Sequence, residues 1–305
     1  MKLSRIYKIW LTVLLASASI FGLTSCNHLL YPAVREPFMS PKFLVPPPQE
    51  LTIPISGTEH KSYLHAWYFP AQSKIKKGFV VHFHGNGENL TTHFNFFKWL
   101  TNMGFDYLIF DYRGYGQSSD ESATQEKTVQ DGLAVFNYIH QQFAPTQLIA
   151  IGQSLGSNVL VRTLQELPKD QLPQMAVLDS SFTSYQSAAS SALSQRWFLY
   201  PLIPLAYLAI DDTYSAEKNY DKTPKVPTLF FHGTNDTLIK KENGIQNYEK
   251  WPGPKALVLN EGGVHTSAFG DPRFVNSNKE ILLNCFSFVT ESKLAQFSDC
   301  TKLSK

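Results

Sequence analysis

Short apolar runs alternate with longer segments of helical character along most of this 305-residue chain. The apolar runs are four to six residues long, too short for buried helices and typical of strands that are covered on both faces. They lie at 64–69, 79–83, 105–110, 148–151, 175–178, 228–231 and 256–259, and the helical segments at 90–100, 124–142, 155–166 and 278–289. This alternation predicts an α/β fold with a mainly parallel central sheet and helices on both faces.

Glycine-rich or polar motifs follow six of the apolar runs. In chain order they read HFHGNGEN, DYRGYGQSS, GQSLGS, DSSFTS, HGTNDTLI and GGVHTSAF. Because parallel strands end at one edge of a sheet, and ligands of such sheets bind at that edge, these motifs predict a single functional site.

The motif GQSLG places Ser154 between Gly152 and Gly156. A G-x-S-x-G sequence is weak evidence alone, but after a strand and before a helix it is typical of a nucleophilic serine on a sharp turn. The N–H of Leu155, at the start of that helix, would face an oxyanion. A second donor is expected from the loop after the run at 79–83, where we favour the N–H of Asn86 over that of Gly87.

A serine nucleophile needs a histidine as base and an acidic residue that orients the histidine. Where the G-x-S-x-G serine lies between a strand and a helix, the acid follows it in the chain and the histidine comes last. His265 is the only histidine after Asp236 and is therefore the candidate base. Asp236 follows the run at 228–231 and is the favoured acid, with Asp179 after the preceding run as the alternative. We interpret two other histidines beside glycines, His84 and His232, as structural.

These motifs resemble those of the α/β-hydrolase superfamily, most closely its Bem46 and ABHD13/ABHD17-like branch and serine peptidase S33-type relatives. HGNGEN is similar to HGNAGN, GQSLGS to GRSLGG and HGTND to HGTKD, and DYRGYG is the same string; Ser157 departs from the usual glycine. The resemblance covers residues 78–289. It implies Ser154 as nucleophile, Asp236 as acid and His265 as base, and a small cap at about 180–220, after the sixth strand. This cap contains the apolar run WFLYPLIPLAYLAI.

The expected function is a serine hydrolase that cleaves carboxylic esters or thioesters through an acyl-enzyme, with no cofactor and no metal. The same triad serves peptidases and amidases, so hydrolysis of peptides or amides is an alternative. A non-catalytic binding lipoprotein on a hydrolase scaffold is the alternative outside enzymes. The oligomeric state is not determined by the sequence.

The first residues read as a targeting segment, in which a basic start and an interrupted apolar stretch precede LTSC. This ending resembles a bacterial lipobox and predicts a signal peptide at 1–25, lipidation of Cys26, a proline-rich tether up to residue 50 and a hydrolase domain at 51–305. An ordinary signal peptide and an uncleaved anchor are the alternatives. We expect attachment to the membrane of the cell envelope, and Asn27 after the cysteine favours the outer membrane.

The formal charge of +2 includes the basic residues of that segment, so the remainder is near neutral and carries no basic stripe. Nucleic acid is therefore not an expected partner. Two cysteines remain, Cys285 and Cys300. An oxidising compartment would allow a disulfide between them, although a buried free thiol and a loose one are equally consistent with the sequence.

Overall fold

A single eight-stranded sheet organises the computed structural model, which describes residues 31–57, 61–194 and 197–303. The strand order is β1-β2-β4-β3-β5-β6-β7-β8. β1 and β2 pair in antiparallel fashion at one edge, β2 is antiparallel to β4, and all later pairings are parallel. The bounds are Gln49–Pro54 (β1), Tyr63–Phe69 (β2), Gly78–Phe83 (β3), Phe105–Phe110 (β4), Leu148–Gln153 (β5), Met175–Asp179 (β6), Thr228–Gly233 (β7) and Lys255–Asn260 (β8).

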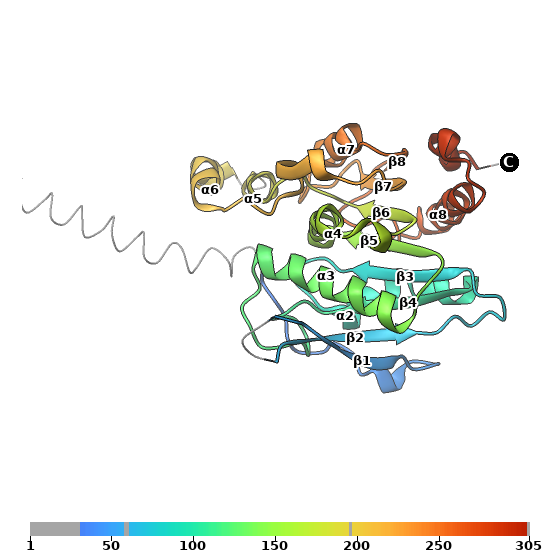
Figure 1. Ribbon diagram of the computed structural model, residues 1–305. Coiled ribbons are helices and arrows are strands. Elements are labelled where there is room, and N and C mark those ends of the chain that lie inside the picture. Colours follow the sequence, from blue (N-terminus) through green and yellow to red (C-terminus); the bar gives the residue numbers. More distant parts are fainter. Residues whose placement is uncertain (1–30, 58–60, 195–196, 304–305) are drawn as a thin grey trace, which may run out of the picture.

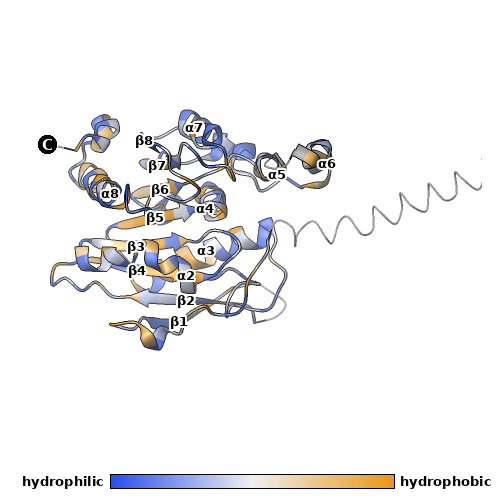
Figure 2. Ribbon diagram, turned by 180° about the vertical axis from the view of Figure 1, so that it is seen from behind, coloured by the Kyte–Doolittle hydropathy of each residue, from blue (hydrophilic) through white to orange (hydrophobic). Residues whose placement is uncertain are grey.

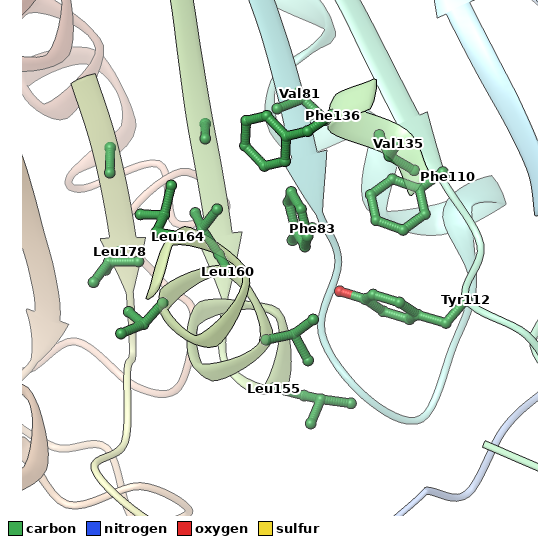
Figure 3. Close-up of a cluster of buried hydrophobic side chains, with 14 of the residues drawn as sticks. Val81, Phe83, Phe110, Tyr112, Val135, Phe136, Leu155, Leu160, Leu164 and Leu178 are labelled. Carbon is green, nitrogen blue, oxygen red and sulfur yellow. The ribbon is translucent and has the colours of Figure 1, made fainter. Parts of the chain in front are cut away.

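Helices cover both faces of the sheet, as the alternation predicts (Figure 1). Side chains of β3 alternate between two apolar clusters, because successive strand residues point to opposite faces. Val81 and Phe83 pack with helices α3 (Gln125–Gln142) and α4 (Leu155–Glu166), as Figure 3 shows. Val80 lies in the other cluster, with helix α8 (Val275–Thr290). The predicted α/β fold with a mainly parallel central sheet is confirmed.

The segment expected to be one helix at 90–100 is instead three short pieces. Helix α2 ends at His93 (Leu90–His93), and two 3₁₀ segments follow, η2 (Phe94–Phe96) and η3 (Lys98–Met103). A 3₁₀ turn places residues three apart on one side. Phe94, Phe97 and Leu100 have that spacing and are fully buried in one cluster, so burial of this stripe favours the tighter turns.

The insertion between β6 and β7 consists of helix α5 (Tyr185–Leu193), the 3₁₀ segment η5 (Trp197–Leu202), helix α6 (Ile203–Ala209) and the 3₁₀ segment η6 (Ala216–Lys222). Ser184 and Ser187 form a capping box that begins α5. The side chain of Gln186 donates to the carbonyls of Tyr207 (3.0 Å) and Ile210 (3.1 Å), which holds α6 against α5. We call residues 185–222 the cap; in Figure 1, α5 and α6 lie beyond the carboxyl ends of the parallel strands.

Within the segment predicted as a tether at 26–50, residues 31–36 contact the domain. Tyr31 is buried and its hydroxyl donates to that of Tyr185 at 3.0 Å. The carbonyl of Val34 accepts from the N–H of Gly116 at 3.0 Å, and Arg35 donates to the carbonyl of Ser118 at 3.2 Å. Prolines without apolar periodicity indicate an extended linker. Tyr31 nevertheless packs against the domain, where its ring is buried beside Tyr185.

A disulfide joins Cys285 of α8 to Cys300 of the 3₁₀ segment η7 (Leu294–Thr301). Both cysteines are fully buried, and the side chain of Asn284 donates to the carbonyl of Cys300 at 2.7 Å. The disulfide is therefore part of the second apolar cluster. Among the helices of residues 31–303 that the structure describes, none combines the length and the apolar content needed for a membrane span.

Candidate active site

Ser154 occupies a strained turn between β5 and α4. Its φ is 51° and its ψ −116°, a conformation that non-glycine residues rarely adopt and that costs about 1–3 kcal/mol. Its N–H donates to the carbonyl of Asp179 at 2.9 Å, which fixes the turn to the neighbouring strand. At Gly156 an added Cβ would lie 2.0 Å from the carbonyl oxygen of Phe83. A glycine is therefore required for this close approach.

The structure brings the three sequence-predicted triad residues together from separate loops. The distance from Ser154 Oγ to His265 Nε2 is 2.8 Å, and that from His265 Nδ1 to Asp236 Oδ2 is 2.7 Å. In this arrangement the serine hydroxyl donates to one ring nitrogen while the other donates to the carboxylate. The His265 side chain is 23% exposed, whereas that of Asp236 is fully buried. Solvent therefore reaches the hydrogen-bonded triad from the side of Ser154 and His265.

Asp236 is held as an ionised carboxylate. Its Oδ1 accepts from the N–H groups of Leu238 (3.0 Å) and Ile239 (2.8 Å), and His232 Nε2 lies 3.5 Å from its Oδ2. Burial raises the pKa of Asp236, but hydrogen bonding to His232 and His265 outweighs burial and holds that pKa well below its ordinary range. A carboxylate in this state stabilises the positive charge that His265 acquires when it takes a proton.

Asp179, the alternative acid, has a different partner. Its Oδ2 accepts from the side chain of Gln153 at 3.0 Å, and Gln153 in turn contacts His82 at 3.1 Å. Burial raises the pKa of Asp179 to about 6 despite the hydrogen bond from Gln153. Of the two candidate acids, the structure places Asp236 on the ring of His265.

The candidate oxyanion donors flank Ser154. Leu155 is the first residue of α4, where N–H groups have no acceptor within the helix. Asn86 follows Gly85, at which a Cβ would lie 3.6 Å from the Cβ of Ser154. The Asn86 side-chain oxygen accepts from the N–H of Gly87 at 3.0 Å and from the hydroxyl of Tyr115 at 2.5 Å. The Gly87 N–H therefore has an acceptor within the loop, and Asn86 as the second donor stays a prediction.

The two histidines interpreted as structural make local contacts. His84 Nδ1 lies 2.7 Å from the carbonyl oxygen of Gly85, and burial together with nearby His93 lowers the pKa of His84 to about 3. His232 Nε2 donates to the carbonyl of Ile239 at 2.8 Å. Each imidazole thus braces a loop of the site. Across residues 31–57, 61–194 and 197–303, no three histidine, cysteine or acidic side chains gather as metal ligands.

Ser180 is a residue that sequence reasoning missed. Its buried Oγ accepts from the N–H of Thr266, directly after His265, at 2.9 Å. Both residues have positive φ, 52° for Ser180 and 51° for Thr266. One hydrogen bond therefore links the end of β6 to the loop of the base. The serine-rich motif DSSFTS was visible in the sequence, but only strand adjacency shows which serine meets this loop.

Ser180→Ala is expected to lower kcat for a soluble ester about tenfold with little change in KM, because loss of about 1.4 kcal/mol of hydrogen bonding loosens the His265 loop. The neighbouring change Ser181→Ala is the control, since Ser181 Oγ accepts from Asn247 at 3.1 Å and not from that loop. Steady-state kinetics of both variants test the assignment. Equal losses in the two variants, or a change confined to KM, would contradict it.

The structure combines an α/β-hydrolase fold with a serine, a histidine and an aspartate in contact, and comparisons with solved structures agree with this fold. The chain has the α/β-hydrolase fold, and a family model described as serine aminopeptidase, S33, matches residues 74–223.

Three known proteins illustrate the similarity. The chain is 28% identical to the YfhR protein of Salmonella typhi over 289 residues, which covers 90% of this chain and 95% of that one. It is 27% identical to the lysophosphatidylserine lipase ABHD12 of Danio rerio, over 58% of this chain and 48% of the lipase. The structure of the esterase Pf2001 of Pyrococcus furiosus superposes with a TM-score of 0.60 at 20% identity, covering 88% and 95% of the two chains.

Proposed function

We propose that this protein is a serine hydrolase that cleaves carboxylic esters or thioesters, with Ser154 as nucleophile, His265 as base and Asp236 as acid. One observation carries the proposal. A continuous chain of hydrogen bonds runs from the hydroxyl of Ser154 through both nitrogens of His265 to a buried, ionised Asp236. That arrangement activates a serine hydroxyl for attack on a carbonyl carbon.

In the acylation step Ser154 Oγ bonds to the carbonyl carbon of the ester while its proton passes to His265 Nε2. The carbonyl oxygen becomes an oxyanion, which the N–H groups of Leu155 and Asn86 stabilise. The intermediate collapses as the bond to the leaving group breaks. The departing alcohol or thiol takes the proton from His265, and the acyl group remains on Ser154.

Deacylation repeats this sequence with water as the nucleophile. His265 removes a proton from water as it attacks the acyl carbon, and then returns the proton to Ser154 Oγ when the carboxylic acid leaves. Asp236 keeps the ring of His265 in one tautomer through both steps. No cofactor is needed for this chemistry.

Ester chemistry is favoured over amide chemistry by two similar proteins, the lysophosphatidylserine lipase ABHD12 and the esterase Pf2001. The family model of a serine aminopeptidase supports peptide or amide hydrolysis as a second candidate. We further propose that the chain belongs to the Bem46 and ABHD13/ABHD17-like branch, on the strength of DYRGYG and the related motifs.

A fluorophosphonate probe and a substrate panel test this function together. The probe is expected to label Ser154 alone, because it reacts with serines that a base activates. p-Nitrophenyl esters of rising chain length, assayed beside aminoacyl amides, should show hydrolysis of esters well above that of amides. The reverse preference would establish the peptidase. Absence of both labelling and turnover would leave a binding protein on a hydrolase scaffold.

We also propose that Cys26 carries a lipid anchor that holds the protein at a membrane of the bacterial envelope, with the outer membrane favoured. Cys26 lies outside the described residues. The LTSC motif supports this location, as does the disulfide between Cys285 and Cys300, because disulfides persist in oxidising compartments.

Cys26→Ala is expected to abolish incorporation of radiolabelled palmitate and to leave an uncleaved precursor, since the lipidated cysteine is the residue at which processing occurs. Cells that express the parent protein or the variant would be labelled and the two products compared by electrophoresis. Ser154→Ala serves as the matched control and should incorporate label normally. Palmitate uptake by Cys26→Ala equal to the parent's would refute the anchor.

A further inference from the structure

We propose that the edge of the molecule carrying the triad lies against a lipid bilayer, so that substrates are amphiphilic esters taken from the membrane surface. The contact is made by exposed apolar side chains of the cap and of the triad loops, which lie at the same edge of the sheet. We call them the rim residues; they are Phe198, Tyr200, Tyr207 and Leu208 of the cap, and Leu238 and Val264 of the triad loops. This inference rests on the proposed lipid anchor and, for its substrate class, on the proposed hydrolase function.

The rim residues expose large apolar side chains to solvent. Leu208 of α6 is 85% exposed, Phe198 of η5 56% and Val264 55%. Val264 directly precedes His265 in the sequence, and Leu238 comes two residues after Asp236. Large exposed apolar patches mark binding to proteins or membranes. Figure 2 shows hydrophobic colouring on α6, at the end of the molecule that carries the cap.

The attachment of Tyr31 to the domain, five positions after Cys26, points to the bilayer as the occupant. Tyr31 is buried against the domain and bonded to Tyr185, the first residue of α5. Cys26 is five positions earlier, and five residues span at most roughly 18 Å even when fully extended. A lipid on Cys26 would therefore be held within roughly that distance of the base of the cap.

The following residues fix this attachment at the carboxyl edge of the sheet. The carbonyl of Val34 accepts from Gly116, in the loop after β4, and from the side chain of Asn89 at 3.2 Å, in the loop after β3. The same loops follow the strands at the edge where Ser154 lies. The anchor and the active site thus share one end of the molecule, and a bilayer that holds the first must lie close to the second.

The opposite edge provides a matched reference position. Ile75 lies in the loop between β2 and β3, at the amino end of β3, and is 74% exposed. The six residues of β3 separate that loop from the carboxyl edge by roughly 20 Å. A probe at position 75 should therefore remain in water when one at position 208 meets lipid.

Depth-dependent quenching tests the orientation on the full-length, lipidated protein. Leu208→Cys and Ile75→Cys would be labelled with an environment-sensitive fluorophore and bound to phosphatidylethanolamine–phosphatidylglycerol vesicles with spin-labelled chains. The other cysteines do not compete, because Cys285 and Cys300 form a disulfide and Cys26 would carry the lipid. We expect quenching at 208 at least threefold stronger than at 75. Equal quenching on vesicles that carry the protein would overturn the orientation.

Failure of the anchor and failure of the orientation give different results in this experiment. A protein without an anchor would not float with the vesicles in a density gradient, whereas an anchored protein with another orientation would float without selective quenching. The quenching measurement does not need catalysis, so it is independent of the triad. A rim buried by a second copy of the chain would show protection of position 208 without lipid and a concentration-dependent dimer, and would also overturn the proposal.

Kinetics test the inferred substrate class. Leu208→Glu places a charge on the rim and is expected to lower hydrolysis of a long-chain ester in vesicles about tenfold, while hydrolysis of p-nitrophenyl acetate stays unchanged. Ile75→Glu should alter neither rate. Equal loss with both substrates in Leu208→Glu, or no loss with either, would contradict delivery of substrate through the rim. Loss of all activity in Ser154→Ala reports separately on the hydrolase function.

Discussion

Ser154→Ala is expected to reduce ester turnover on the order of 10⁶-fold, as is typical when a triad loses its serine, and to abolish labelling by a fluorophosphonate. The hydroxyl that donates to His265 is the only group removed. The fold should persist, because alanine is no larger than serine. Active-site titration and progress curves with a p-nitrophenyl ester measure the effect.

The stability of this variant provides its control. The conformation of residue 154, with φ at 51°, is imposed by the turn between β5 and α4 and not by the hydroxyl of Ser154. The temperature of thermal unfolding should therefore be nearly unchanged. A variant that keeps full activity and labelling would show that IGQSLGSN is only a turn. The serine hydrolase assignment would then fail.

Asp236→Asn is expected to lower kcat by up to about four orders of magnitude. An asparagine amide at this site would favour the wrong tautomer of His265 and would not stabilise the imidazolium. The isosteric change keeps the acceptor for the N–H groups of Leu238 and Ile239, so the loop should hold its shape. Single-turnover kinetics on the variant separate loss of chemistry from loss of binding.

Asp179→Asn is the matched comparison, since it changes the other buried carboxylate of the same sheet edge in the same way. Asp179 accepts from Gln153, which an asparagine oxygen can replace, and it has no hydrogen bond to His265 in the structure. Its effect on kcat should be less than about tenfold. Should Asp179→Asn prove the more damaging change, the acid would belong to β6 and our assignment would be reversed.

The pKa values add a stability signature to this pair. Burial raises the pKa of folded Asp179 to about 6, above its unfolded value, so ionisation of this group costs stability as pH rises through that range. Asp236 has the opposite sign, because its lowered pKa stabilises the fold at neutral pH and this contribution is lost in acid. Asp179→Asn should therefore make unfolding less sensitive to pH between about 4 and 6.

The sequence by itself determined the fold class and the serine and histidine of the candidate triad. A run of four to six apolar residues indicates a strand that is buried on both faces, and it can be recognised without knowing which strands lie beside it. The order of Ser154, Asp236 and His265, with a single histidine in the last position, reduced the choice of base to one residue. Helix α7 (Lys241–Lys250) escaped notice because few of its residues are buried and its polar sequence carries little periodicity.

Only the tertiary structure decided how distant residues meet. Asp236 and Asp179 are both aspartates at strand ends, and the sequence left both possible; loop geometry placed one of them 2.7 Å from His265. The contact of Tyr31 with Tyr185 and the pairing of Cys285 with Cys300 are likewise absent from any local pattern. A propensity depends on neighbours in the chain, whereas these contacts depend on the mutual arrangement of strands, loops and helices, which exists only once the sheet has formed.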